Sequence, residues 1–384
     1  MSTKVLHVVN ISFVLPHFIG EQFAFFESRG ISFFVACSPS EHLLEYAKLK
    51  EFTPILVNIN KKFSLIEDIK ATIKLIKVIK RADIKIVVGH TPKGGLIAMI
   101  AAHIAGINKR IYFRHGLMYE TSKGVKRFVL KKVERLTANL ATKVVCVSNS
   151  VLKVSREQKL GNPAKNIILN KGTCNGIDFE TRFNRSLVRE FQIAELKSKY
   201  KIGPYHKVVG FVGRLVNDKG INELIDAWKL LIQNEENVKL LLIGPFEDRD
   251  SIGLELKEYI INEPNIIYTG LIDDIVPYYC LMDVFILPSY REGFPTVILE
   301  ASAMELPIIT TKVTGCIDAI IENNTGLFSS LEPKDILDKL LIYLHNPELA
   351  LLHGKNGRSF VKANFCQLKI WREIEEKVFE LENV

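Results

Sequence analysis

The chain has 384 residues, of which 47% are hydrophobic and 24% are charged, and its formal net charge is +8. This composition excludes a disordered or low-complexity chain, and the length predicts two domains rather than a single core. The charge is unevenly divided, because residues 1–173 contain 28 Lys and Arg against 11 Asp and Glu, whereas the remaining residues contain 23 against 32. We therefore expect a basic first domain and an acidic second domain.

The six cysteines form no C-x-x-C pair and have no metal-type spacing, which predicts free thiols in a reducing cytoplasm. The first apolar run, Val5–Val9, is too short for the apolar region of a signal peptide. The most apolar helix candidate, Leu96–Ile107, is too short to span a bilayer. We expect a cytoplasmic protein whose contact with a membrane is at most peripheral.

Short apolar runs alternate with helical periodicity in the first half, as in a Rossmann-like α/β domain. No G-x-G-x-x-G fingerprint follows the first strand, so nothing there predicts a dinucleotide. The predicted strands are Lys4–Asn10, Ile31–Ala36, Pro54–Asn58, Ile84–Val88, Arg110–Phe113 and, as the last of this half, Val144–Val147.

Two predicted helices of this half, Ile66–Arg81 and Lys123–Leu136, are basic and amphipathic. In the first, Ile69, Ile73 and Ile76 share one face and Lys70, Lys74, Lys77 and Arg81 another; in the second, Val125, Phe128, Val129, Val133 and Leu136 are predicted to face inward and Arg127, Lys131 and Arg135 outward. A solvated helix face is the simplest interpretation of either helix alone. Two such helices in a basic domain favour an anionic surface, and the lack of interleaved aromatic residues favours phospholipid headgroups over nucleic acid.

Two loops that follow predicted strands carry candidate ligand-binding side chains. Gly89–Gly95 follows one strand and Arg114–Gly116 follows the next. A single histidine is more often structural than functional. Ligands of parallel α/β sheets bind at the carboxyl ends of the strands, however, so the position of these two loops favours ligand binding. The candidate ligand-binding side chains of this domain are His17, His90, Thr91, Lys93, Arg114 and His115.

The turn signal Asn175-Gly176 lies where we expect the chain to cross into the second domain, within Gly172–Asp178. Beyond it, Phe179–Gly203 is polar and predicted to be helical. The predicted strands are Lys207–Val212, Lys239–Ile243, Asn265–Tyr268, Val284–Leu287, Val313–Asp318 and Thr325–Phe328.

The strand Lys207–Val212 ends in the sequence GRLVNDKG, Gly213–Gly220, before a predicted helix, Ile221–Gln233. Arg214 and Lys219 beside this glycine turn could neutralise a diphosphate. An exposed turn with two solvated cations is the alternative. Asp248-Arg249-Asp250 is formally a D-x-D sequence, but one tripeptide is a weak metal signal and we interpret it as surface charge.

The stretch from Val284 to Glu305 combines a buried strand, a loop with Glu292, and a helix that begins near Pro295-Thr296. Thr296 is predicted to cap this helix, and Glu300 lies one turn further in. A loop that meets a helix N-terminus suits an anionic ligand, and a carboxylate suits the diol of a ribose. The alternative is a surface loop and an ordinary helix with both glutamates solvated.

Glu292–Glu300 resembles the E-x7-E motif of the retaining glycosyltransferases of family 4, and Gly213–Gly220 resembles the G-R-L…K-G donor motif of that family. The segments TPKGGLIA, RHGLMYE and GTCNGID resemble a branch that extends polyprenyl-diphosphate-linked saccharides for capsule, O-antigen or protein glycosylation. That branch often has Arg-Gly-Leu where this chain has Arg114-His115-Gly116-Leu117. The resemblance covers nearly the whole chain.

The resemblance implies the α/β fold called GT-B, in which two Rossmann-like domains with parallel sheets face each other across a cleft. The acceptor-binding domain would be residues 1–173, the nucleotide-sugar-binding domain residues 174–365, and residues 366–384 would form a C-terminal helix, Leu368–Leu381, that packs back on the first domain. The resemblance also implies a donor site, made of Gly213, Gly244, Thr269, Gly270, Leu271, Gly293, Phe294, Pro295, Thr296, Val297 and Glu300. It implies an acceptor site in the first domain, made of His17, His90, Thr91, Lys93 and Arg114, and a catalytic role for His115.

The implied reaction is transfer of a sugar from a nucleotide-diphospho-sugar, with UDP as the expected base, to a saccharide or lipid-linked saccharide. Arg214 and Lys219 would stabilise the leaving diphosphate and Glu292 would orient the sugar, with neither a protein nucleophile nor a metal or other cofactor. The expected partners are the donor, the acceptor and the anionic inner face of the plasma membrane, but no nucleic acid. A sugar-nucleotide epimerase, a phosphorylase on the same scaffold and a non-catalytic nucleotide-sugar-binding subunit are the alternatives.

Overall fold

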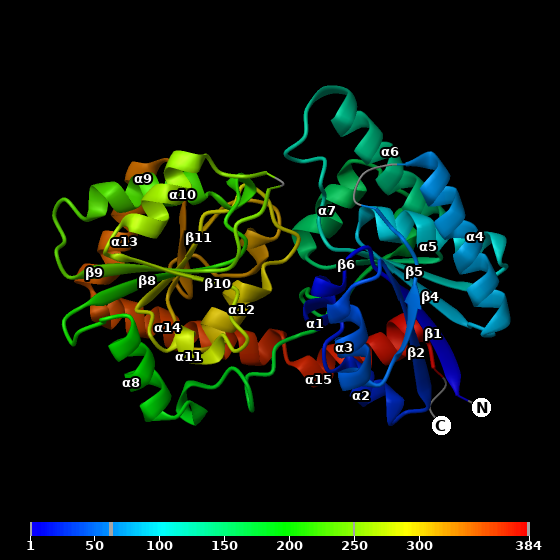
Figure 1. The fold of residues 1–384 in the computed structure, drawn as a ribbon, viewed down its shortest axis with the longest axis horizontal. Coiled ribbons are helices and arrows are strands. Elements are labelled where there is room, and N and C mark those ends of the chain that lie inside the picture. The colour runs from blue at the N-terminus through cyan, green and yellow to red at the C-terminus, as the bar shows by residue number, and fades with distance from the viewer. Residues whose placement is uncertain (1, 61–63, 249, 382–384) are drawn as a thin grey trace. The chain divides into compact units, whose positions relative to one another are not determined.

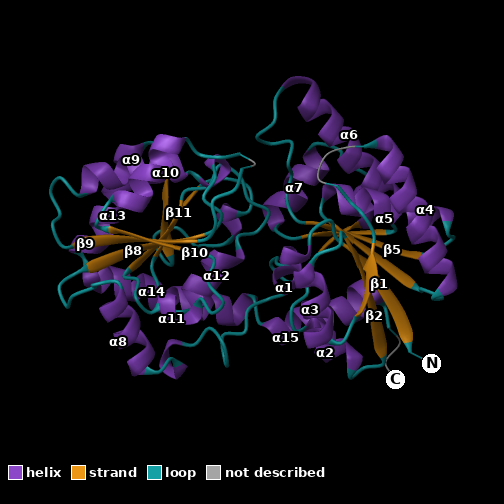
Figure 2. Ribbon diagram, in the orientation of Figure 1, coloured by secondary structure: helices purple, strands orange, loops and turns teal. Residues whose placement is uncertain are grey.

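The computed structural model describes residues 2–60, 64–248 and 250–381, and it forms two compact units (Figure 1). The first unit contains the chain up to Gly176 and again from Gln367, and the second unit contains Ile177–Cys366. The boundaries predicted from the sequence are residues 173 and 365, within three residues of those in the structure. Each unit is an α/β domain with its own parallel sheet, as Figure 2 shows in orange.

In the described part of the first unit, seven parallel strands are arranged in the order β3-β2-β1-β4-β5-β6-β7. They are β1 (Thr3–Val8), β2 (Ile31–Cys37), β3 (Thr53–Leu56), β4 (Ile86–His90), β5 (Lys109–Arg114), β6 (Lys143–Cys146) and β7 (Asn166–Ile168). The prediction that β6 is the last strand of this half is wrong. The strand β7 has only three residues and begins with Asn166, so it lacks the apolar run by which the other strands are recognised.

The helices of the first unit cover both faces of its sheet (Figure 1). They are α1 (Leu15–Phe18), α2 (Gln22–Glu27), α3 (Glu41–Lys50), α4 (Leu65–Arg81), α5 (Pro92–Ile104), α6 (Gly124–Leu140), α7 (Asn149–Glu157) and α15 (Gln367–Glu373), which continues as a π-helical turn (Ile374–Phe379). On one face α4, α5 and α6 share a core with Leu75 and Ala138. On the other face Phe25 of α2 packs on Trp371 of α15 with ring centroids 5.1 Å apart.

The returning C-terminal segment is fixed to the first unit by polar contacts as well. The indole Nε1 of Trp371 donates to Asn175 Oδ1 at 2.9 Å, and Lys109 Nζ donates to the carbonyl oxygen of Phe379 at 2.7 Å. Phe379 is 1% exposed and lies beside Phe26 of α2. Burial of these aromatic side chains favours the attachment of the segment, since each removes a large apolar area from water.

The apolar face predicted for α6 points outward instead. Val125, Phe128 and Leu136 are 79%, 62% and 47% exposed, while Glu134 is 2% exposed. The reason is a buried ion pair: Arg114 Nε donates to Glu134 Oε2 at 3.1 Å, and this pairing turns the side of α6 that carries Glu134 toward the sheet. A helix has one rotation about its axis, so an inward Glu134 leaves the apolar stripe exposed.

The apolar face predicted for α4 is rotated in the same way. Ile69 and Ile73 are 50% and 48% exposed, and the buried side is made of Ala71, Leu75 and Ile79. The helix therefore exposes isoleucines as well as lysines at its surface, whereas the sequence predicts only that the two kinds of side chain lie on different faces.

In the described part of the second unit, six parallel strands have the order β10-β9-β8-β11-β12-β13. They are β8 (Lys207–Val212), β9 (Val238–Ile243), β10 (Ile266–Gly270), β11 (Val284–Leu287), β12 (Ile308–Thr311) and β13 (Gly326–Ser329). The predicted strand Val313–Asp318 is wrong, because β12 lies earlier and Cys316–Asp318 is a 3-10 turn. Gly315 between them has φ +84°, a backbone conformation that ends a strand.

The helices α9, α10 and α13 lie on one face of this sheet, and α11, α12 and α14 lie on the other (Figure 1). The helices of the unit are α8 (Glu190–Lys199), α9 (Ile221–Leu231), α10 (Leu254–Asn262), α11 (Val276–Tyr279), α12 (Thr296–Ala303), α13 (Pro333–His345) and α14 (Pro347–Asn364). Helix α8 is much shorter than the predicted Phe179–Gly203. The core between the layers contains fully buried Trp228, Phe211 and Phe285.

Candidate active site

The candidate donor site lies at the carboxyl edge of the second sheet, where the strand order changes direction. The strand β8 comes first in this unit, β9 lies on one side of it and β11 on the other, so the switch point is between β8 and β11. Ligands of open parallel sheets bind outside the carboxyl ends of the strands at such a point. The turn Gly213–Gly220 follows β8, and the loop with Glu292 follows β11.

At this edge Lys219 and Glu292, 73 residues apart in sequence, form a hydrogen-bonded ion pair. Both side chains are largely buried, with exposed fractions of 16% and 11%. Ser289 Oγ donates to the same carboxylate oxygen of Glu292 at 2.7 Å. The two motifs that the sequence suggested separately therefore converge, and Ser289 is a member of the site that sequence reasoning missed, although it follows the strand break at Pro288.

Glycine is required where the turn after β8 approaches the β11 loop. Gly220 has φ +71°, and a Cβ built on it would lie 1.9 Å from the carbonyl oxygen of Pro288. No other residue fits there without movement of the backbone. The absence of a side chain at residue 220 thus lets Lys219 approach Glu292.

Further contacts tie the same two loops together. Tyr290 N–H donates to the carbonyl oxygen of Asp218 at 2.9 Å, and Arg291 pairs with the Asp218 carboxylate at 2.8 Å. Asp250 accepts a hydrogen bond from Asp218 N–H at 2.7 Å, so it stabilises the turn and is not merely surface charge. Arg249 of the D-x-D tripeptide lies outside the described residues.

The helix α12 begins at the predicted place but is not capped as predicted. Its N-cap residue is Pro295 and Thr296 is the first helical residue, so the expected cap by Thr296 is wrong. Proline has no polar side chain, and the amides of the first turn are therefore left without a side-chain acceptor from the cap position. The predicted donor residues Gly293, Phe294 and Val297 flank this helix start; Gly293 is buried and the other two are half-buried.

Glu300 lies one turn into α12 and is held by Tyr279, whose hydroxyl donates to Glu300 Oε2 at 2.8 Å. Tyr279 is 0% exposed, and burial, with the nearby Glu300 carboxylate, raises its pKa well above the usual range. The hydroxyl therefore stays protonated and serves as a donor. Tyr279 is a second residue that sequence reasoning missed, because nothing in its local pattern indicates a distant partner.

Arg214 does not join Lys219 and Glu292. Its Nη1 donates to Glu247 Oε2 at 2.9 Å, and the Arg214 side chain is 41% exposed. The backbones of Gly213 and Gly244 lie close together, since a Cβ built on Gly244 would be 2.0 Å from the Gly213 carbonyl oxygen.

The predicted donor-site residues Thr269 and Gly270 end β10 at the same edge of the sheet, and Leu271 follows them. The N–H of Gly244 donates to the carbonyl oxygen of Gly270 at 2.9 Å, which places this strand end beside the β9 loop. Thr269 is half-buried and Leu271 is 62% exposed. The loops after β10, β9, β8 and β11 thus follow one another along one edge.

Most of the acceptor-binding candidates of the first unit are buried. His90 is 1% exposed and both of its ring nitrogens are occupied, at 2.9 Å from His7 and at 2.9 Å from His115. Lys93 is 6% exposed and pairs with Asp68 at 2.8 Å. Partners within the protein therefore already use the polar atoms of His90 and Lys93, and a direct contact of either residue with an acceptor stays a prediction.

Arg114 is also buried and paired within the first unit. It is 0% exposed, pairs with Glu134, and donates through Nη2 to the carbonyl oxygen of Leu160 at 3.0 Å. Burial raises the pKa of Glu134, which the Arg114 charge only partly offsets. Arg114 thus links β5, α6 and Leu160 in this structure, and its contact with an acceptor stays a prediction.

The other first-unit candidates differ in accessibility. His17 is exposed on α1, and His115 is half-buried at the carboxyl end of β5. The hydroxyl of Thr91 is buried without a hydrogen-bond partner among the described residues. His17 and His115 are therefore the candidates of this unit that remain accessible.

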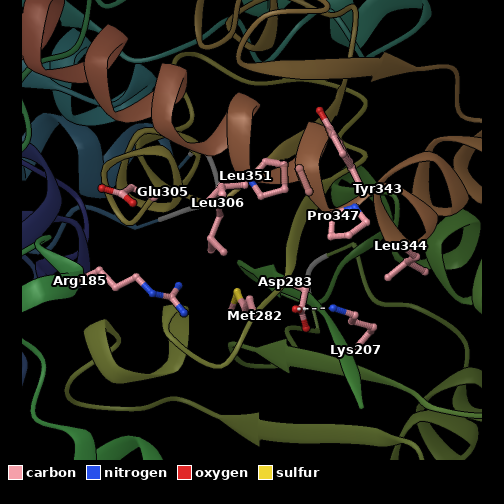
Figure 3. Close-up of a pocket in the computed structure, with 12 residues that line it drawn as sticks. Arg185, Lys207, Met282, Asp283, Glu305, Leu306, Tyr343, Leu344, Pro347 and Leu351 are labelled. Carbon is pink, nitrogen blue, oxygen red and sulfur yellow. Dashed lines mark hydrogen bonds and ion pairs between the residues drawn. The ribbon is translucent and has the colours of Figure 1, made fainter. Parts of the chain in front are cut away.

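A pocket of the second unit lies away from the predicted donor residues (Figure 3). It measures about 270 Å³ and is bordered by Lys207, the first residue of β8, and Asp283, which precedes β11. Their side chains pair at 3.5 Å, drawn as a dashed line in Figure 3. The pocket is thus at the amino edge of the sheet, opposite the switch point, and we assign it no part in donor binding.

In the part of the chain that the structure describes, no group of three or more His, Cys, Asp or Glu could hold a metal ion. None of the described helices is both long and apolar enough to cross a bilayer.

Comparison with protein families and solved structures agrees with this geometry. Residues 206–346 match the model of the glycosyl transferases group 1, and residues 4–148 match the glycosyl transferase 4-like model. Solved structures with a similar fold include a glycosyltransferase from Rickettsia africae, with a TM-score of 0.80 and 19% identity over 99% of this chain and 100% of that one. HepE from Anabaena in complex with UDP-glucose has a TM-score of 0.80 and 18% identity, over 98% and 100%.

Two curated relatives match over most of their length. The capsular polysaccharide biosynthesis glycosyltransferase CapM of Staphylococcus aureus is 34% identical over 379 residues, 97% of this chain and 96% of the relative. An Escherichia coli UDP-Gal:alpha-D-GlcNAc-diphosphoundecaprenol alpha-1,3-galactosyltransferase is 24% identical over 352 residues, 90% and 88% of the two chains. The matches cover both units, and the chain therefore belongs to the family 4 glycosyltransferases of the GT-B fold.

Proposed function

We propose that this glycosyltransferase transfers a sugar from a nucleotide-diphospho-sugar, with retention of anomeric configuration, to a polyprenyl-diphosphate-linked saccharide during synthesis of a bacterial surface glycan. The names of CapM and of the undecaprenol-linked galactosyltransferase support this class of acceptor and pathway. UDP is the proposed base, which the UDP-glucose complex of HepE supports through its similar fold.

The observation that carries the proposal is the pair of Lys219 and Glu292 at the switch point of the second sheet. A cation and a carboxylate in contact there serve two different parts of one donor. Lys219 would neutralise the diphosphate as it leaves, and Glu292 would accept hydrogen bonds from sugar hydroxyls. The uncapped first turn of α12 provides amides for the same diphosphate.

Glu300 and Arg214 have subordinate roles in this proposal. The Tyr279 hydroxyl holds one oxygen of Glu300, which leaves the other oxygen to accept from the ribose diol. Arg214 would bind phosphate only after it exchanges its partner Glu247, since the two side chains are paired in the free protein. The acceptor hydroxyl would lose its proton to the leaving phosphate, so neither a protein nucleophile nor a metal takes part.

Nucleotide binding gives the first test. We expect UDP and a UDP-sugar, added at a hundredfold excess over the dissociation constant, to stabilise the protein by about 2.7 kcal/mol. Stabilisation by GDP or ADP should be smaller, and Mg²⁺ should not be needed. Differential scanning fluorimetry measures the shift, and Glu300→Gln should reduce it because a neutral amide accepts the ribose diol less strongly.

The requirement for a saccharide acceptor distinguishes the proposed transferase from an epimerase and from a phosphorylase. An epimerase would convert the UDP-sugar without any acceptor, and a phosphorylase would need free phosphate. A non-catalytic subunit would bind the nucleotide but transfer nothing. Transfer of radiolabelled sugar to a lipid-diphosphate saccharide, absent without that acceptor, supports the proposal; stabilisation by no nucleotide would contradict it.

We further propose that the first unit binds the anionic inner face of the plasma membrane through α6 and α4. Exposed apolar side chains and cations lie together on these helices, with Val125 and Phe128 beside Lys126 and Lys132 on α6. Such a surface would insert its apolar residues at the headgroup level while its cations attract anionic lipid. Membrane attachment would place the enzyme at a polyprenyl-linked acceptor.

Reversal of charge on α6 tests this surface. In Lys126→Glu plus Lys132→Glu, binding to vesicles of anionic phospholipid should fall at least about tenfold, since each cation near an anionic surface contributes about 1 kcal/mol. Co-flotation measures the loss, and the exposed lysines of α8, changed as Lys197→Glu plus Lys199→Glu, are the matched control. Equal binding by wild type and the α6 variant would exclude this surface as the contact.

A further inference from the structure

Three histidines form a continuous hydrogen-bonded chain in the first unit. His7 Nδ1 lies 2.9 Å from His90 Nε2, and His90 Nδ1 lies 2.9 Å from His115 Nε2. They come from β1, from the last residue of β4 and from the loop directly after β5. His90 is thus the central member, with one neighbour at each ring nitrogen.

The register of the sheet explains why these residues meet. His7 stands opposite Val88, and His90 stands opposite Phe113. His90 is two residues beyond Val88 and His115 two beyond Phe113, so all three side chains point to the same face. The chain of histidines runs diagonally from the interior to the carboxyl edge, across the switch point between β1 and β4.

The surroundings are aromatic and keep the imidazoles neutral. His115 stacks on Phe18 with ring centroids 3.6 Å apart and an interplanar angle of 7°. Burial lowers the pKa of His7 and of His115 to about 3. Burial, with the neighbouring histidines, lowers the pKa of His90 well below its usual value. All three rings are therefore neutral at physiological pH, and each has one N–H and one bare nitrogen.

This arrangement couples the three protons. Each nitrogen-to-nitrogen contact needs one donor and one acceptor. The nitrogen that carries the proton in one ring therefore fixes which nitrogen carries it in the next ring. The protons are then on Nδ1 in all three rings or on Nε2 in all three. At the inner end, His7 Nε2 is buried and has no hydrogen-bond partner among the described residues.

The inner end favours the Nδ1 arrangement. Unpaired buried N–H groups are rarer in proteins than unpaired buried acceptors, so a bare Nε2 on His7 is preferred to a protonated one. If His7 carries its proton on Nδ1, it donates to His90 Nε2, and His90 in turn donates from Nδ1 to His115 Nε2. His115 Nε2 is then bare, and the proton of His115 is on Nδ1. That atom makes no hydrogen bond to a described residue, and His115 is the half-buried outer end of the chain.

We propose that His90, supported by His7, is a positioning residue that locks His115 in the neutral Nδ1–H tautomer, so that His115 donates a hydrogen bond to an oxygen of the saccharide substrate. The substrate part rests on the proposed transferase function, whereas the tautomer part does not. A locked donor differs from a free imidazole, which populates both tautomers and therefore carries its N–H at Nδ1 for only part of the time.

The tautomer is measured on the full-length protein without substrate. Long-range ¹H–¹⁵N spectra of ¹⁵N-histidine-labelled wild type should show His115 with a protonated Nδ1 and a bare Nε2. A mixture of tautomers, or a bare Nδ1, would overturn the lock. Because this measurement needs neither a variant nor activity, it remains decisive if a variant does not fold.

Two variants of His90 separate positioning from packing. His90→Phe keeps the ring volume but has no donor, whereas His90→Asn leaves a cavity but carries a side-chain N–H near the former Nδ1. If His90 only fills space, His90→Phe should be more stable and more active than His90→Asn, and it should preserve the tautomer of His115 better. If His90 locks the tautomer of His115, we expect the opposite order for tautomer and activity. His90→Asn should then keep a single tautomer of His115, and His90→Phe should show a mixture.

The kinetic readout tests the substrate part. We expect His90→Phe to raise KM for the saccharide acceptor about tenfold, the size seen when a partner that orients a functional histidine is removed. His90→Asn should remain within a few fold of wild type, and His103→Asn, at an exposed histidine of α5, should alter neither readout. Equal KM values in all variants would overturn the substrate part. A locked tautomer in an enzyme without transferase activity would instead contradict the proposed function alone.

Discussion

Replacement of Lys219 by methionine is expected to lower kcat for sugar transfer by about 10²–10³-fold, the cost of one lost charge-stabilising group at a reacting centre. Methionine keeps the length and apolar character of the lysine stem but removes its charge. The effect should be mainly on kcat, because negative charge on the diphosphate grows as the bond to the sugar breaks. Steady-state kinetics with a UDP-sugar and a lipid-linked acceptor measure it.

The environment of Lys219 makes a control necessary. Loss of the lysine also leaves the Glu292 carboxylate without its ion-pair partner, and part of any loss of activity could come from loop movement. Arg291→Met is the matched control, because Arg291 precedes Glu292 in the loop after β11, has a similar exposed fraction of 18%, and pairs with Asp218 of the turn after β8 at 2.8 Å. It stabilises the loop without a proposed contact to the donor, so its effect should be tenfold or less.

The two variants together decide between the roles. Wild-type turnover in Lys219→Met would remove Lys219 from the proposed mechanism. Equal losses in Lys219→Met and Arg291→Met would mean that loop geometry, and not charge at the diphosphate, is what the lysine provides. Thermal unfolding of both variants shows whether the fold is retained.

Replacement of Arg114 by methionine is expected to destabilise the first unit by about 3–5 kcal/mol, the cost of leaving one partner of a buried ion pair alone. Glu134 is 2% exposed and would keep its charge or take up a proton without a cation nearby. Its remaining partner is the Tyr112 hydroxyl, which donates to Oε1 at 3.0 Å. Chemical denaturation measures the change in the free energy of unfolding.

A second substitution should reverse much of this loss. In Arg114→Met plus Glu134→Gln the unpaired charge is gone, and the Gln oxygen can still accept from Tyr112. Lys70→Met is the matched exposed control, since Lys70 pairs with Glu67 at 2.9 Å with side chains 68% and 36% exposed. Exposed pairs contribute about 0–1 kcal/mol. A loss of similar size in Arg114→Met and Lys70→Met would contradict the importance of burial.

The sequence by itself determined the fold class, most of the strands and the two donor motifs. Apolar strand runs such as Val284–Leu287 and glycine turns such as Gly213–Gly220 are local patterns, and the structure confirms both elements. The family followed from the same motifs. Local patterns are readable because backbone conformation and strand burial depend mainly on nearby residues.

The tertiary structure alone decided which side chains meet. Lys219 and Glu292 come together through the order of β8 and β11, Tyr279 reaches Glu300 from another helix, and the histidine chain depends on the register of three strands. None of these partners is close in sequence. A change of register by one residue would turn each histidine to the opposite face of the sheet.

The rotation of helices was equally beyond the sequence. Amphipathic periodicity predicts that the apolar stripe of α6 faces inward, but the buried pair of Arg114 and Glu134 turns that stripe to the surface. The same pair buries Arg114, one of the acceptor candidates, within the first unit. Burial of a single charge costs several kcal/mol of folding free energy unless the charge is paired. Exposure of one apolar side chain costs less. One long-range ion pair therefore overrides the local pattern.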